Sequence, residues 1–164
     1  MKNLLFIFLF LFSYPSIVLS SDNEQKYKLA LERIANNDFT IIITEVYNKN
    51  NQYNITPEKM YTDCYLTVKG TQSVLRIDPQ IDERNSYIID TDSSVENISK
   101  PNAKDKIYII KLCGEQSWQN MEARVTLYKN SNICYVQIIS KKYRNEKLGM
   151  KGYIDIENSE VIKQ

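Results

Sequence analysis

The chain has 164 residues, a formal net charge of +1, a hydrophobic content of 43% and no histidine. This length suits a single domain with one core. Without histidine the chain lacks the commonest general base and the commonest metal ligand, which excludes Ser-His-Asp and Cys-His catalysis. The near-neutral charge argues against nucleic acid as a partner, because phosphate contacts need a cationic surface. We therefore expect a protein that is not an enzyme and that holds no metal or other cofactor.

The first twenty residues have the layout of a secretory signal peptide. Lys2 supplies a positive start, an unbroken apolar run covers residues 4–12, and Ser20 offers a small residue for cleavage. The run is shorter than the roughly 20 residues that a membrane span needs, and an uncleaved anchor is the alternative. Cleavage after Ser20 leaves 20 basic and 20 acidic side chains. The sequence therefore predicts an exported protein, soluble in the periplasm or outside the cell, with no transmembrane span in the mature chain.

The segment after the predicted cleavage site indicates a helix over residues 21–35. Tyr27, Leu31 and Ile34 recur there at helical spacing and form one narrow apolar face. From residue 39 onward the pattern changes to the period of two that is typical of strands. Strands are predicted at residues 39–47, 61–69, 73–77, 86–90, 95–99, 106–113, 122–129, 133–140 and 150–157.

These elements predict a mainly β fold, an antiparallel barrel or sandwich of about eight or nine strands with one N-terminal helix. The expected organisation is a signal peptide at 1–20, the helix at 21–36 and one antiparallel β domain at 37–164. Alternate strand residues are expected to form the core: Phe39, Ile41, Ile43, Leu66, Val68, Ile110, Leu112, Val125, Leu127, Val136 and Ile138.

Several of these segments resemble the Bacteroidetes family of domains of unknown function numbered 4251. The similar segments are residues 39–47, 65–70, 125–130, 136–140 and 151–154. They share with the family the spacing of apolar residues and the glycines at Gly70 and Gly152. The resemblance implies an exported protein with a lipocalin-like β architecture. It implies no activity, because none is assigned to the family.

Strand parity sorts the three cysteines. Cys64 and Cys134 fall on the expected core faces of their strands, whereas Cys113 falls with Lys111 on the opposite face. Export brings the chain into an oxidising environment, so one hypothesis is a Cys64–Cys134 disulfide through the interior. The equally weighted alternative is a pair of inert buried thiols. Cys113 is expected to be a free thiol in either case.

Carboxylates remain as candidates for chemistry, but their pattern supports neither a metal site nor a catalytic site. Residues 90–94 place oxygen ligands at alternate positions, yet Val95 and Pro101 stand where a calcium loop needs its glycine and its glutamate. A hydrogen-bonded turn is the favoured interpretation of this segment. A hydrolase that uses carboxylates alone is the least favoured function, because it needs two acidic groups held at a set separation.

Three aromatic residues, Trp118, Tyr108 and Tyr135, are the candidate ligand-binding side chains, because the mouth of a barrel is a common ligand site. Trp118 lies in a polar connection, where plugging one end of the barrel is the other interpretation. The first functional hypothesis is an exported protein that binds a small apolar ligand or an envelope partner without catalysis. The alternative is a structural or interaction module of the cell envelope that has no ligand cavity.

Overall fold

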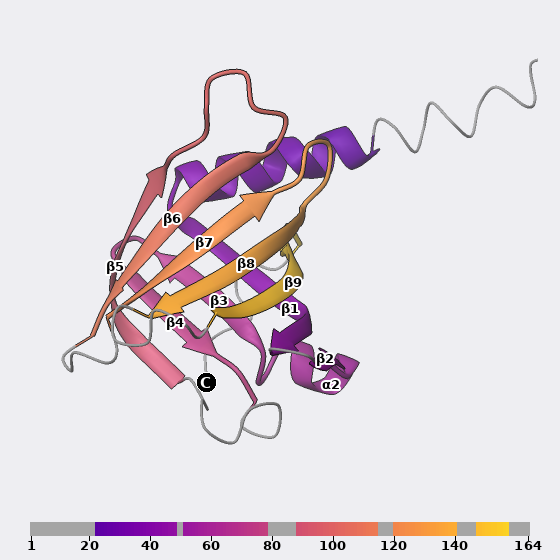
Figure 1. The fold of residues 1–164 in the computed structure, drawn as a ribbon. Coiled ribbons are helices and arrows are strands. Elements are labelled where there is room, and N and C mark those ends of the chain that lie inside the picture. Colours follow the sequence, from indigo (N-terminus) through magenta and orange to yellow (C-terminus); the bar gives the residue numbers. More distant parts are fainter. Residues whose placement is uncertain (1–21, 49–50, 79–87, 115–119, 141–146, 158–164) are drawn as a thin grey trace, which may run out of the picture.

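The computed structural model describes residues 22–48, 51–78, 88–114, 120–140 and 147–157. The predicted signal peptide at 1–20 and Trp118 lie outside these residues. The N-terminal helix covers residues 22–35, and a short helix, α2, covers Pro57–Met60. The strands are β1 (Asp38–Asn48), β2 (Asn51–Asn54), β3 (Tyr65–Lys69), β4 (Gln72–Arg76), β5 (Ile88–Asn97), β6 (Lys106–Cys113), β7 (Met121–Leu127), β8 (Ile133–Ser140) and β9 (Lys147–Ile154) (Figure 1).

Eight of the strands close into an antiparallel barrel. Neighbours along the chain pair from β3 to β9, and β1 completes the barrel by pairing with both β3 and β9. The long strand β1 carries two partners on one edge, with residues 38–42 opposite β3 and residues 45–48 opposite β2. β2 is therefore an extra strand that continues the line of β3. The predicted mainly β fold with an N-terminal helix is confirmed, and the barrel is the form that it takes.

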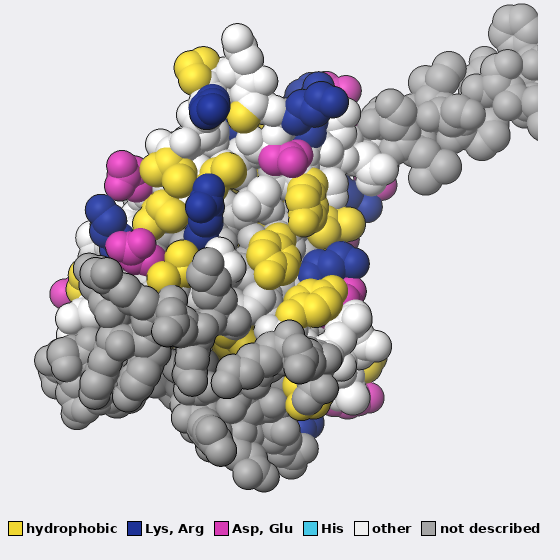
Figure 2. All heavy atoms as spheres, viewed as in Figure 1, with side chains coloured by type: hydrophobic (Ala, Val, Ile, Leu, Met, Phe, Trp, Pro, Cys, Tyr) yellow, Lys and Arg dark blue, Asp and Glu magenta, His cyan; other side chains and the backbone are white. Residues whose placement is uncertain are grey.

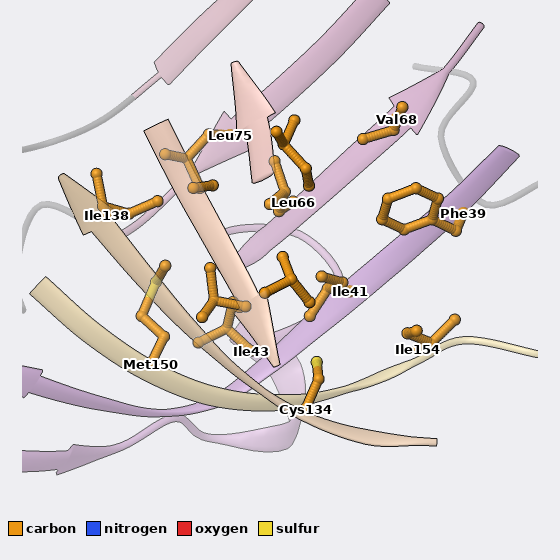
Figure 3. Packing of buried hydrophobic residues seen from close by; sticks show 14 of the residues in the cluster. Phe39, Ile41, Ile43, Leu66, Val68, Leu75, Cys134, Ile138, Met150 and Ile154 are labelled. Carbon is orange, nitrogen blue, oxygen red and sulfur yellow. The ribbon is translucent and has the colours of Figure 1, made fainter. Parts of the chain in front are cut away.

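Apolar side chains from alternate strand positions fill the interior. All of the predicted core residues are buried. Figure 3 shows Ile43, Leu75 and Met150 pointing into this interior from β1, β4 and β9. None of these three side chains has any accessible surface. A side chain without accessible surface borders no gap that could hold a water molecule, so the middle of the barrel is tightly packed.

The two helices lie at opposite ends of the barrel (Figure 1). Ala30 and Ile34 of the N-terminal helix are buried in the core cluster, and Tyr27 and Leu31 pack against it. The apolar face predicted for this helix is therefore confirmed. At the other end Ile55, just before α2, is buried as well.

Some element boundaries differ from the prediction for local reasons. The strand predicted over 61–69 begins at Tyr65, because α2 and a turn occupy the residues before it, and Pro57 favours the first turn of that helix. The turn expected at 90–94 is wrong, since these residues lie within β5. The two short strands predicted at 86–90 and 95–99 are thus one strand, in which hydroxyl side chains of Thr91 and Ser93 take inward positions.

In the described part of the chain, no helix combines the length and the apolar character needed to cross a membrane.

Candidate functional site

The structure does not bring the predicted ligand-binding residues together. Tyr108 lies on β6 with its side chain in the core, where burial raises its pKa. Tyr135 lies on β8 between the inward-facing Cys134 and Val136, so its ring points outward. Tyr108 and Tyr135 are therefore on opposite faces of the barrel wall. Trp118 lies outside the described residues.

The three cysteines are free thiols. Cys64 and Cys134 are buried and Cys113 is exposed, as strand parity predicts. The Cys64 carbonyl bonds to Ile43 of β1, and Cys134 lies opposite Gly152 of β9, so β1 and β9 separate the two buried thiols. The structure shows the two buried cysteines as free thiols, and the Cys64–Cys134 disulfide stays a prediction for a thiol count. Burial raises the pKa of Cys134 to about 12.

A row of large side chains crosses the outside of the barrel wall. The strand register places Tyr65 of β3 opposite Ile42 of β1, Ile42 opposite Tyr153 of β9, and Tyr153 opposite Ile133 of β8. Tyr128, directly after β7, donates its backbone N–H to the Ile133 carbonyl and continues the row. Each of the five points outward, because at least one of its neighbours in sequence points into the core. We call these five residues the tyrosine row.

The tyrosine row is covered at one end and exposed at the other. Ile42 and Tyr65 are only 2% and 7% exposed, although they point away from the core. Ile133 and Tyr128 are 41% and 40% exposed. Figure 2 shows apolar side chains gathered on the side of the barrel formed by β6 to β8. The exposed end of the row therefore adds to an apolar surface on the outside of the protein.

The segment that joins β2 to β3, residues 55–64, which we call the strap, contacts the tyrosine row at Tyr153. Tyr61 of the strap shares a hydrogen bond of 2.6 Å between its hydroxyl group and that of Tyr153. Burial first, and then the bond to Tyr61, raise the pKa of Tyr153.

A polar cluster lies beside the row on a β-bulge of β1. The register of β1 against β9 shifts just before Glu45, which places Thr44 and Glu45 together opposite Lys151. The Glu45 carboxylate accepts hydrogen bonds from Lys151 Nζ at 3.0 Å, from Gln52 Nε2 at 2.8 Å and from the Tyr47 hydroxyl. The bond from Tyr47 and then the bond from Lys151 lower the pKa of Glu45, so this carboxylate is held ionised.

Tyr47 and Tyr135 lean toward one another across β9. Their ring centroids are 6.5 Å apart at an interplanar angle of 48°. Gly149 lies between them on β9, and a Cβ atom at this position would come within 2.1 Å of the Tyr135 hydroxyl oxygen. Gly149 therefore leaves the space in which the Tyr135 side chain lies, and the two rings add aromatic surface beside the tyrosine row.

Two exposed cations on the outside of the barrel form no ion pair within the described ranges. These are Arg124 of β7 and Lys129, which follows the same strand. By contrast Lys111 of β6 and Lys151 of β9 each pair with a glutamate. The surface around the exposed end of the row therefore presents positive charge that is available to a partner.

Sequence reasoning missed this face, although part of the signal was present. Alternation along β8 and β9 places Ile133, Tyr135 and Tyr153 at outward positions. Only the register between strands shows that Tyr153 lies between Ile133 and Ile42, and that Tyr65 lies on the other side of Ile42. Among the residues that the structure describes, no group of three or more Cys, Asp or Glu side chains is placed to hold a metal ion.

A scan against protein-family models and a search of the curated proteins find no match for this chain. Among solved structures, the chain is similar to the crystal structure of a DUF4251 family protein from Bacteroides eggerthii. The TM-score is 0.64 at 14% sequence identity, and the alignment covers 82% of this chain and 90% of that chain. At this identity the likeness concerns the fold. The chain therefore has the fold of a DUF4251 family protein, and the resemblance to this family found in the sequence is confirmed at that level.

Proposed function

We propose that this protein is an exported, non-catalytic interaction module that binds a protein partner of the cell envelope on the outside of its barrel. The observation that carries the proposal is the exposed end of the tyrosine row, where Ile133 and Tyr128 are 41% and 40% exposed. Protein interfaces are enriched in tyrosine and arginine, and Arg124 is exposed on the same outward side of β7, four residues before Tyr128. The unpaired charge of Arg124 favours a partner that offers a carboxylate.

A small apolar ligand inside the barrel is the weaker alternative. Ile43, Leu75, Ile110 and Met150 come from four different strands, and none of them has accessible surface. A ligand among these side chains would need space that their packing does not leave. The solved structure with the similar fold belongs to a family of unknown function and indicates no catalytic step.

The export part of the proposal rests on the N-terminal sequence and is tested separately. Cleavage after Ser20 predicts that protein recovered from its native envelope begins at Ser21. N-terminal sequencing, or the intact mass, measures this directly. A chain that still begins at Met1 would contradict cleavage and would support the uncleaved anchor.

Photo-crosslinking in the native cell tests the partner site. A photoreactive amino acid is placed at position 133 or, as a matched control, at position 98. Ile133 and Ile98 are both 41% exposed, but only Ile133 belongs to the tyrosine row. We expect one discrete crosslinked product from position 133 and none from position 98. We also expect the product to weaken when Arg124→Glu reverses the charge on the outward side of β7. Equal crosslinking at both positions, or none at position 133, would overturn the proposal.

Benzene binding tests the alternative of an internal ligand. Leu75→Ala removes a fully buried side chain and leaves an apolar cavity, which serves as the positive control. We expect benzene to shift the methyl NMR signals of the variant and to leave those of the natural protein unchanged. Saturable binding to the natural protein would favour the carrier alternative.

A further inference from the structure

The outward side of β7 carries charges of both signs that the protein itself leaves unpaired. Along this strand Glu122, Arg124 and Thr126 alternate with core residues, and Tyr128 and Lys129 follow directly. Within the described residues, Glu122, Arg124 and Lys129 take part in no ion pair. The outside of β7 therefore presents one negative group and two positive groups to a partner.

Apolar side chains flank β7 on both neighbouring strands. The register places Ile107 of β6 on one side of Thr126 and Tyr135 of β8 on the other. Ile109 lies next along the outside of β6, opposite Arg124. Figure 2 shows two groups of apolar side chains on this face, with basic side chains beside them. Because Thr126 is smaller than the side chains around it, a second surface can approach closely at this point.

The order of the groups along β7 makes this surface complementary to itself. A two-fold axis that runs across β7 at Thr126 lays a second β7 over the first in the opposite direction, so that every contact occurs twice. Glu122 is four residues before Thr126 and Lys129 is three residues after it, so these opposite charges of the two copies meet. Arg124 and Tyr128 are each two residues from Thr126, which brings the guanidinium group of one copy to the aromatic ring of the other.

The parallel arrangement of two β7 strands is disfavoured by the same charges. It would place Arg124 of one copy opposite Arg124 of the other, and likewise Glu122 opposite Glu122. Like charges placed together across an interface weaken it. The charge order therefore selects the antiparallel arrangement.

We infer that the partner of this surface is a second copy of the same chain, and that the two copies form a symmetric dimer through β7. The inference rests on the proposed function, because it names the partner and identifies Glu122 of the second copy as the carboxylate that it offers. The barrel wall is convex, so the contact is confined to β7 and the side chains that flank it. Stable interfaces bury about 1,200 Å² or more, and smaller ones are transient. We therefore expect a dimer that dissociates on dilution.

Charge reversal on the two sides of the contact provides a specific test. Glu122→Lys places lysines opposite each other at two points of the dimer, and Lys129→Glu does the same with glutamates. Each variant alone should therefore have a dissociation constant that is raised about tenfold or more. An equimolar mixture of the two variants restores both ion pairs and should associate as tightly as the natural protein. Sedimentation velocity of the mature protein over a wide range of concentrations measures each dissociation constant.

A second pair of variants controls for the change in net charge. Glu58→Lys on α2 and Lys69→Glu at the end of β3 make the same changes of charge at exposed positions, on elements that do not pair with β7. Alone or mixed, these variants should associate like the natural protein. A natural protein that stays monomeric would overturn the inference. A mixture of the variants at positions 122 and 129 that stays dissociated would overturn it as well.

The crosslinking experiment separates this inference from the proposed function. Ile133 accepts a backbone hydrogen bond from Tyr128 and so lies at the edge of the dimer contact. A product from position 133 with the mass of two chains would support both proposals. A product that contains a different protein would show that the second copy is wrong, and the proposed function would stand. If position 133 gives no product, the proposed function is wrong, and sedimentation still decides whether the dimer forms.

Discussion

The wall formed by β8, β9 and β1 has two faces that the chain specifies in different ways. On the inner face, Val136, Met150 and Ile43 follow a simple alternation and are completely buried. On the outer face, Tyr135 lies across Gly149 and leans toward Tyr47. The inner face is specified by the apolar character of each residue, because apolar side chains are stabilised by removal from water. The outer face depends on which residues the register brings together.

The largest expected effect on the free energy of unfolding comes from truncating a side chain of the inner face. Leu75→Ala removes a fully buried side chain and should lower the free energy of unfolding by about 2–5 kcal/mol. Ile133→Ala on the outer face, where the side chain is 41% exposed, should change it by about 0.5 kcal/mol or less. Urea unfolding of the two variants measures the difference. A similar loss in both would show that the outer face is packed as firmly as the core.

The two glycines of β9 allow contacts with the backbone to be compared with contacts on the outer face. A Cβ at Gly152 would lie 2.2 Å from the backbone oxygen of Ile42, where β9 closes against β1. Backbone cannot move aside cheaply, so Gly152→Ala should cost about 1–3 kcal/mol of unfolding free energy. Gly149→Ala meets the end of the Tyr135 side chain, which can rotate away, and its cost should be smaller.

The control for this pair is a change of background. In a Tyr135→Ala protein, Gly149→Ala should lower the free energy of unfolding much less than it does in the natural protein, because the colliding hydroxyl group is gone. The cost of Gly152→Ala should be unchanged there. Thermal unfolding of the four variants provides the comparison, and an unchanged cost at Gly149 would show that Tyr135 is not its cause.

A smaller effect is expected from pH at the polar cluster of the outer face. The folded protein lowers the pKa of Glu45, so this carboxylate stabilises the fold above its ordinary pKa range. That contribution is lost as the pH falls through the lowered pKa. Glu45→Gln should therefore flatten the decline in unfolding free energy between about pH 5 and pH 3. Identical pH profiles for the variant and the natural protein would exclude a contribution from Glu45.

No effect at all is expected from reductant. Cys64, Cys113 and Cys134 are free thiols, so dithiothreitol should leave the unfolding curve of the protein unchanged. A thiol count on denatured, unreduced protein should find all 3 cysteines reactive. A count of one reactive thiol would show that the two buried cysteines form a disulfide.

Local patterns account for the parts of the fold that the sequence predicts correctly. Helical spacing identified the apolar face of Tyr27, Leu31 and Ile34 on the N-terminal helix. Alternation identified Ile110 and Val125 as core residues. Both features can be predicted from the sequence, because the repeat of a helix or a strand sets the direction of its side chains independently of the rest of the chain.

The sequence by itself determined the β class of the protein, its N-terminal helix and the inward residues of its strands. Tertiary structure alone decided that Tyr108 and Tyr135 lie on opposite faces and that the tyrosine row exists. The physical reason is that these features depend on register and closure. A bulge before Glu45 and the match of β1 to both β3 and β9 set which residues meet, and these contacts join segments that are far apart in the chain.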